Sequence, residues 1–197
     1  MDLSSKQQTI LRDVSRFARN AMAKNDPAHD SRHVERVVQL TRQLCSGLPQ
    51  ADGFRAELLA WLHDLNDDKL ASDLGAASIA LYLEEIGVEK SDIDFILHGI
   101  PYISYRKYPK LSDDIPLEIR LVQDADRMDA MGAIGIARTF AYGGAKGRTL
   151  EDSLAHFDEK LLKLYDLLST DAARELAMQR RDFLLQFYRQ FKEEQEC

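Results

Sequence analysis

Apolar residues recur at helical spacing along most of the chain. In the first segment Ile10, Val14, Phe17 and Met22 return every three to five residues, which places their side chains on one face of an α-helix. No segment shows a convincing period-two alternation typical of a strand. The predicted helices run from Ser4 or Ser5 to about Lys24, about Asp30 to Leu44, about Ala51 to Asp64, about Ser72 to Glu85, Ser91 as N-cap to His98 or Gly99, Pro116 to about Met131, about Ile134 to Gly143-Gly144, Asp152 to Leu168, and about Asp171 to Glu194.

This pattern predicts an all-α protein with a bundle-like globular fold. Between Ile100 and Pro116 the helical pattern dissolves, and the segment carries two prolines and several tyrosines. We predict a loop there, and loops of this length often line binding sites. Ser104 and Tyr105 are therefore candidate substrate contacts.

Composition narrows the class of protein. The 197 residues, 45% apolar and 30% charged, suit a single domain with a sizeable core. The net charge of −7 argues against a nucleic-acid binder, which usually presents a basic face. An acidic protein can still bind an anionic nucleotide if a metal and a few cations line its pocket.

Location is also constrained by composition. No apolar run approaches the roughly 20 residues that a membrane-spanning helix needs, and the N-terminus lacks the apolar region of a signal peptide. The two cysteines, Cys45 and Cys197, imply no disulfide framework, and we expect Cys45 to be a buried small hydrophobe. We expect a cytoplasmic protein with no membrane partner.

The clearest chemical signal is the adjacent pair His63-Asp64, at the end of an apolar helical run. The pair offers an imidazole nitrogen and a carboxylate oxygen to one point, and both are donors that divalent transition metals accept. His33 upstream and the acidic residues of the Gln123–Asp129 stretch downstream are further candidates. Alone, a His-Asp pair is a weak signal, because most such pairs are surface features.

The order His, then His-Asp, then Asp resembles the HD superfamily of metal-dependent phosphohydrolases. The flanking strings "AHDSRHVERV", "HDLNDDK", "QDADRMDAMGAIGIARTFAYGGAKGR" and "AHFDEKLLKLYDLL" resemble the small stand-alone bacterial HD hydrolases. The resemblance covers nearly the whole chain and implies one HD domain over residues 1–197. Its metal-binding core would span about residues 25–145, followed by C-terminal helices over about residues 150–195.

The resemblance implies metal ligands at His33, His63, Asp64 and a later aspartate. The string around Asp126 resembles the "ADRL" string that carries the last ligand in many HD proteins, so we predict Asp126 as the fourth ligand. Asp124 or Asp129 would then orient a ligand histidine or a water, and Asp124 stays open as the alternative ligand.

Two nitrogen and two oxygen ligands leave two positions on an octahedral cation for water and a phosphate oxygen. We predict one divalent ion, preferably Mn²⁺, with Fe²⁺, Co²⁺, Ni²⁺ or Mg²⁺ as alternatives. Ser104-Tyr105 stands roughly where many two-metal HD enzymes carry an extra histidine, which favours a single metal.

Asp67 and Lys69 follow the pair closely and match the "HD…D.K" string of the family. The resemblance implies a catalytic role for both: a carboxylate can move a proton, and a lysine can hold a phosphate as a point charge. The alternative is a charged helix end.

A cationic, glycine-bearing string follows the predicted metal helix and includes Arg138, Lys146 and Arg148. Such a string can bring cations and backbone N–H groups to a phosphate chain, so Arg138 and Lys146 are candidate substrate contacts. A helix C-cap with a solvated turn explains the same residues equally well.

These observations predict a single-metal phosphohydrolase that acts on a small phosphorylated molecule. The resemblance implies a nucleotide, with cleavage of nucleoside triphosphates and release of pyrophosphate as one outcome. A phosphodiesterase is one alternative, and a helical module that binds metal or nucleotide without catalysis is another. A homodimer is left open.

Overall fold

The computed structural model describes residues 3–22, 31–65, 75–105, 107–108 and 111–195. These residues form nine α-helices and one 3-10 helix, and none of them lies in a strand, which confirms the all-α prediction. The helices are α1 (Ser5–Met22), α2 (Ser31–Ser46), α3 (Gly53–Leu62), α4 (Ala76–Glu85), α5 (Lys90–Ile103), α6 (Leu117–Asp129), α7 (Gly132–Ala145), α8 (Leu150–Glu159) and α9 (Asp171–Gln195), with η1 (Leu161–Lys163) after α8.

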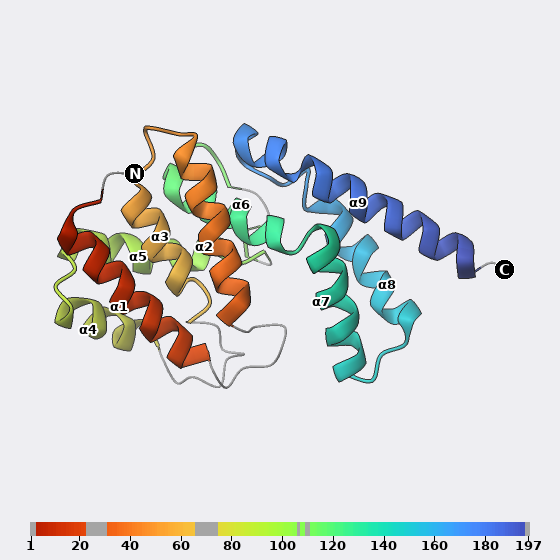
Figure 1. The fold of residues 1–197 in the computed structure, drawn as a ribbon, viewed down its shortest axis with the longest axis horizontal. Coiled ribbons are helices and arrows are strands. Elements are labelled where there is room, and N and C mark those ends of the chain that lie inside the picture. The colour runs from red at the N-terminus through yellow and green to blue at the C-terminus, as the bar shows by residue number, and fades with distance from the viewer. Residues whose placement is uncertain (1–2, 23–30, 66–74, 106, 109–110, 196–197) are drawn as a thin grey trace.

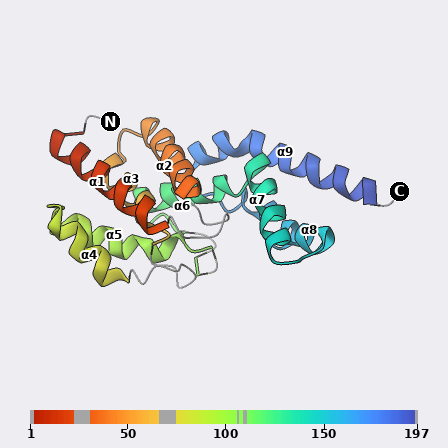
Figure 2. The ribbon, with the colours of Figure 1, turned by 60° about the horizontal axis from the view of Figure 1, so that its bottom comes forward.

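Helix α3 is the centre of the N-terminal part. Of its residues only Arg55 is not buried, because α1, α2, α5 and α6 all pack against it. A helix buried on every side needs no amphipathic pattern, which explains its nearly continuous apolar run. Helices α4 and α5 form a layer below α1 and α2 (Figure 2).

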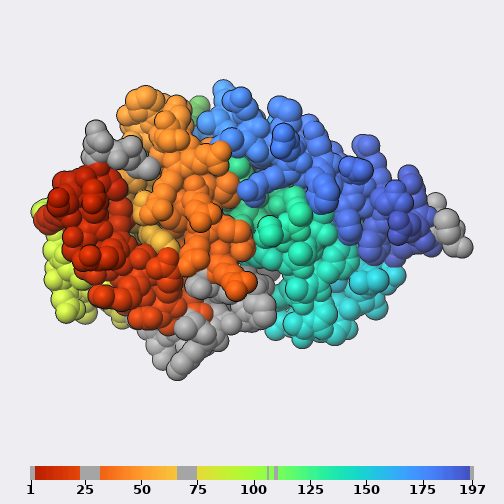
Figure 3. Space-filling model, viewed as in Figure 1, coloured from red at the N-terminus to blue at the C-terminus, as the bar shows by residue number. Residues whose placement is uncertain are grey.

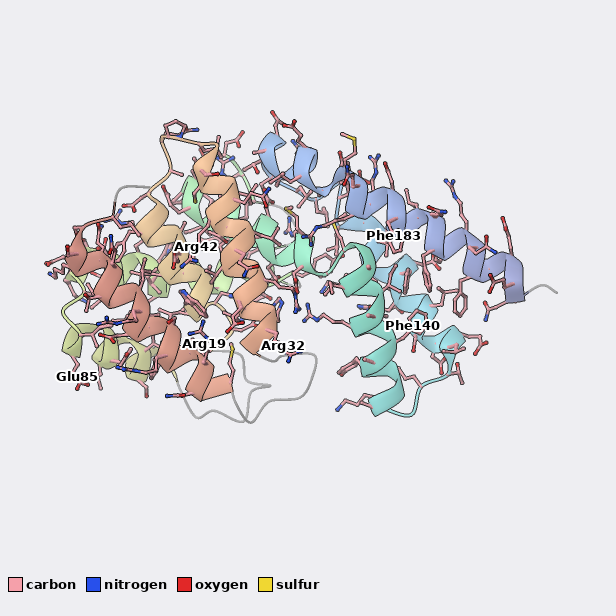
Figure 4. All side chains as sticks on the ribbon, viewed as in Figure 1. Arg19, Arg32, Arg42, Glu85, Phe140 and Phe183 are labelled. Carbon is pink, nitrogen blue, oxygen red and sulfur yellow. The ribbon has the colours of Figure 1, made fainter. Side chains whose placement is uncertain are left out.

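An ion pair whose carboxylate is buried and whose guanidinium is half exposed lies between α2 and α3. Glu57 is almost fully buried and accepts hydrogen bonds from both ends of the Arg42 guanidinium and from the Trp61 indole. Arg42 extends from α2 toward α3 (Figure 4). This pairing compensates the cost of burying a carboxylate inside the core.

The C-terminal part consists of α7, α8 and α9, which lie beyond α6 from α1 (Figure 1). Its interior is aromatic: Phe140 points from α7 toward the ring of Phe157 on α8 and the rings of Phe187 and Phe191 on α9 (Figure 4). Helix α6 contacts both α7 and α9, so it connects the two parts. On the face of Figure 3, the surface of α2 separates α1 from the C-terminal helices.

Two predicted helix ends were wrong by several residues, and the N-cap of α5 is Glu89 rather than the predicted Ser91. Helix α5 continues to Ile103, past the predicted end at His98 or Gly99, and contains Pro101. Proline lacks the N–H that would complete one helical hydrogen bond there, and its ring crowds the preceding turn, and α5 ends two residues later. The first residues of the predicted loop therefore belong to α5.

The predicted helix from Asp152 to Leu168 is also shorter, because α8 ends at Glu159. Lys160 has φ −135° and ψ −58°, outside the helical region, and η1 follows. The apolar spacing nevertheless continues to Leu168. Although the backbone changes to a 3-10 helix and turns, the side chains of Leu161, Leu164 and Leu168 are still buried in the core. The predicted ends at Lys24, Asp30 and Ser72 lie outside the described residues.

Cys45 is buried as predicted and forms no disulfide. Among the described residues, no helix combines the length and the apolarity that crossing a membrane requires.

Candidate metal centre

Three helices that pack on one another deliver the predicted ligands to one place. His33 lies in the first turn of α2, His63 caps the C-terminus of α3, Asp64 follows in the next turn, and Asp126 lies on α6. The three helices contact each other pairwise. Ligands far apart in sequence therefore meet on rigid backbone.

The distances among these side chains are short. His33 Nε2 lies 3.5 Å from an Asp64 oxygen and 3.3 Å from Asp126 Oδ1. His63 Nε2 lies 3.4 Å from Asp64 Oδ1 and 4.0 Å from Asp126 Oδ1. One ligand atom from each of His33, His63 and Asp64 falls within 4.8 Å of the others. The four side chains thus present two nitrogens and two carboxylates to a common space.

The imidazole of His63 is oriented for ligation. Its Nδ1 lies 2.8 Å from the carbonyl oxygen of Ala60, so Nδ1 carries the proton and Nε2 exposes its lone pair. His63 Nε2 is fully buried and has no hydrogen-bond partner among the described residues. Leaving such an atom unpaired is costly, and a cation in contact with Nε2 would remove that cost. The residues present therefore fit a divalent metal ion.

Asp129 orients the second imidazole. This carboxylate is fully buried and accepts from His33 Nδ1 at 2.7 Å. It also accepts two hydrogen bonds from Arg36 and one from Arg138, at 2.6–3.0 Å. Burial would raise the pKa of Asp129, but its hydrogen bonds with His33 and Arg36 and the charge of Arg138 outweigh burial and lower it to about 2. The Nε2 of His33 is thereby turned toward Asp64 and Asp126.

Arg138, a candidate substrate contact, is thus in contact with this carboxylate. Its Nη1 atom donates to Asp129 and lies 3.2 Å from His33 Nδ1. The substrate role of Arg138 stays a prediction.

Asp124 faces a different part of the molecule. Its two oxygens accept from the backbone N–H groups of Ser169 and Thr170 and from the Thr170 hydroxyl, at 2.8–2.9 Å. Thr170 in turn caps the first turn of α9 through Ala173 N. Asp124 therefore fastens the start of α9 to α6, while Asp126, two residues on, faces the histidines.

Charge is concentrated at the cluster. Burial would lower the pKa of His33, but hydrogen bonds to Asp126 and Asp129 and the charge of Asp64 raise it to about 9. Burial would raise the pKa of Asp126, but the two imidazoles and Lys160 hold it well below its ordinary range. Without a metal, His33 therefore holds a proton at neutral pH. A metal ion must displace that proton, since ligation requires the neutral imidazole.

Ser104 and Tyr105 lie just beyond α5. Ser104 is its C-cap, and the Ser104 carbonyl accepts from Tyr108 N. The ammonium of Lys160 lies 4.9 Å from the centre of the Tyr105 ring. Sequence reasoning missed Lys160, because a lysine in an amphipathic segment reads as solvent-exposed. The only signal was its place in the family-like string.

The remaining predicted residues lie elsewhere. Lys146 is exposed at the C-cap of α7, where its ammonium lies 5.6 Å from the Tyr142 ring, and Arg148 lies 5.4 Å from the same ring. Asp67 and Lys69, the predicted catalytic pair, lie outside the described residues.

The whole chain was compared with known proteins. No family model matches the chain. The chain is 39% identical over 188 residues to the protein YpgQ of Bacillus subtilis (strain 168), covering 92% of this chain and 91% of YpgQ. A crystal structure of an HD-superfamily hydrolase from Bacillus thuringiensis is 38% identical, covers 97% of this chain and 99% of the other, and has a TM-score of 0.78.

The chain belongs to the HD superfamily of hydrolases. The family resemblance of the sequence strings is thereby confirmed. The crystal structure of Bacillus subtilis YpgQ in complex with ADP is similar to this chain, with a TM-score of 0.85 and 34% identity. The similarity covers 96% of each chain.

Proposed function

We propose that this HD protein is a single-metal phosphohydrolase whose cation is held by His33, His63, Asp64 and Asp126. The observation that carries the proposal is the buried Nε2 of His63, which has no hydrogen-bond partner among the described residues. Together with His33 Nε2 it faces two carboxylates within 4.0 Å.

Two imidazoles and two carboxylates favour a first-row transition ion over Ca²⁺, which prefers oxygen ligands alone. We propose Mn²⁺ as the preferred ion, with Fe²⁺, Co²⁺, Ni²⁺ and Mg²⁺ as alternatives. Bound there, such an ion supplies a Lewis acid that polarises a phosphoryl oxygen and makes hydroxide available near neutral pH.

The protein's own residues supply orientation and proton transfer. Asp129 and the Ala60 carbonyl fix the tautomers of the two histidines, so both present Nε2. Asp67 would accept or deliver the proton of the attacking water, and Lys69 would hold a phosphate oxygen. Both roles come from the family-like string and are part of the proposal.

The proposed substrate is a nucleotide, and hydrolysis of a nucleoside triphosphate with release of pyrophosphate is the proposed reaction. Support comes from the ADP bound to Bacillus subtilis YpgQ, since this chain shares its fold across nearly its whole length. An acidic surface is no obstacle, because the anion would contact the metal and nearby cations.

The test is turnover of a nucleotide panel by metal-stripped protein to which Mn²⁺ or Co²⁺ is returned. We expect release of phosphate or pyrophosphate from at least one nucleoside triphosphate, and loss of turnover when the metal is chelated. No release across the panel, with tight ADP binding retained, would replace the hydrolase by a non-catalytic binding module.

Two pairs of variants test the residue roles. Asp126→Asn and His63→Ala should each lose metal affinity and turnover together. Asp124→Asn should keep metal affinity but lower the stability of the fold, because the Asp124 carboxylate binds the start of α9. Asp67→Ala should keep the metal and lose turnover. Retained metal affinity in Asp126→Asn, with loss in Asp124→Asn, would reverse the choice of fourth ligand.

A further inference from the structure

Lys160 stands at the point where the C-terminal part of the chain turns back toward α6. Helix α8 ends one residue earlier, and the backbone of Lys160 leaves the helical region with φ −135° and ψ −58°. After η1 the chain returns to α6, where the Leu167 carbonyl accepts from Arg127 and Ser169 N donates to Asp124. The break therefore directs this segment to the helix that carries Asp126.

Helix α6 also holds the segment that carries the Tyr105 ring, which lies next to the Lys160 ammonium. Gln123 donates to the carbonyls of Tyr102 and Tyr108, at 2.6 and 2.9 Å, and Arg127 donates to the Tyr108 carbonyl at 3.1 Å. These bonds fasten the chain on both sides of Tyr105. Gln123 and Asp126 are three residues apart and so are neighbours on the surface of α6.

Lys160, Tyr105 and Asp126 thus come from three separate segments to one side of α6. The ammonium lies 4.9 Å from the Tyr105 ring centre, a distance at which cation–π attraction orients a lysine. The two Gln123 hydrogen bonds place this ring, and the lysine over it, on the side of α6 that also carries Asp126. Lys160 is partly buried rather than fully solvated.

The net charge of the cluster indicates that a bound nucleotide would need further positive charge. A divalent ion and the carboxylates of Asp64 and Asp126 together carry no net charge, whereas a nucleotide polyphosphate is strongly anionic. Arg36 and Arg138 bind the buried Asp129, which offsets part of their charge. A further positive group beside Asp126 would favour the bound phosphates.

We propose that Lys160 contacts the phosphates of the bound nucleotide and that Tyr105 is a positioning residue for its ammonium. This inference rests on the proposed function, because it places the phosphate beside the proposed metal ligands. A compact ammonium with three N–H donors binds phosphate as a point charge. The Tyr105 ring lies at a distance from which it can orient the ammonium.

The test measures ADP and inorganic pyrophosphate binding to the Mn²⁺-loaded protein for Lys160→Ala, with Lys163→Ala as matched control. Lys163 is exposed three residues further along, and its ammonium bonds only the Glu159 carbonyl among the contacts resolved. We expect Lys160→Ala to weaken both ligands about tenfold or more, as loss of a charged hydrogen bond does. Lys163→Ala should bind both probes as wild type does, and all three proteins should still bind Mn²⁺ without nucleotide.

Tyr105 variants separate the two roles. Tyr105→Phe keeps the aromatic ring and should bind ADP as tightly as the wild type does. Tyr105→Leu lacks the ring and should bind ADP a few-fold more weakly. Equal ADP affinity in Lys160→Ala and wild type would overturn the inference, and so would a wild-type protein that binds neither probe. If affinity falls as expected while no nucleotide is hydrolysed, the hydrolase proposal fails and the phosphate contact stands.

Discussion

Two polar segments lie close together in the sequence, but one is buried in the fold and the other is exposed. The first, Gln123–Asp129 on α6, is almost wholly buried, with Asp126 alone partly exposed. The second, from Tyr142 to Arg148 at the end of α7, is mostly exposed, and its two cations lie over the ring of Tyr142 in the same string. In the first string the polar side chains reach other segments, and in the second they stay local.

Helix α6 uses its polar side chains to assemble the site. Gln123 holds the Tyr102–Tyr108 segment, Asp124 holds the start of α9, Arg127 holds Leu167, and Asp129 holds His33. Asp126 remains to face the two histidines. Buried polar groups require partners, so a polar helix inside a core specifies which segments surround it. The α7 string has no such requirement.

The largest expected effect is that of Asp129→Ala. Removing this carboxylate leaves Arg36, Arg138 and His33 without their shared acceptor, and breaking a buried ion pair from one side costs about 3–5 kcal/mol. Urea unfolding should show that loss. Mn²⁺ affinity should fall about 10–100-fold, because the imidazole of His33 is no longer held.

Asp182→Ala is the matched control, since Asp182 pairs with Arg181 on the surface of α9. It should change stability by less than about 0.5 kcal/mol and leave metal affinity alone. Unfolding free energies that are equal for the two variants would remove the distinction between the buried network and a surface pair.

The second expected effect is a pH dependence that the exposed string should not share. The pKa of His33 in the metal-free protein is raised from 6.5 to about 9, so its proton stabilises the fold below pH 6.5 and this stabilisation is lost as pH rises through 9. Metal binding should release this proton, and Mn²⁺ affinity should therefore rise between pH 6.5 and 9. Isothermal titration calorimetry in buffers of different ionisation enthalpy measures the release. A wild-type protein that takes up the metal without releasing a proton would contradict this account.

Much of the fold could be predicted from sequence, because apolar spacing follows directly from helix geometry. The break at Lys160 could not, since Leu161, Leu164 and Leu168 keep helical spacing while the backbone turns. Residue types alone indicated His63-Asp64 as a candidate ligand pair, and the family-like strings were needed to complete the set with His33 and Asp126. Apart from the family-like string around Asp126, nothing local separated Asp124 from Asp126. Their difference arises from Ser169 and Thr170, more than 40 residues away, and a tertiary contact of that kind leaves no periodic trace.

The smallest expected effect is that of the double variant Lys146→Ala/Arg148→Ala. Both cations stack on the Tyr142 ring at the surface, where a cation–π contact contributes about 0.5–1 kcal/mol, so the unfolding free energy should fall by about that much or less. Lys146 also lies eight residues beyond Arg138 on α7, about 12 Å along a helix. We therefore expect the KM for a nucleotide to rise by less than about threefold, against about tenfold for Lys160→Ala. Steady-state kinetics of the two variants side by side decide the matter. A KM increase in the double variant that equals that of Lys160→Ala would assign the α7 string to the phosphates after all, and the contrast between the buried and the exposed string would then concern stability alone.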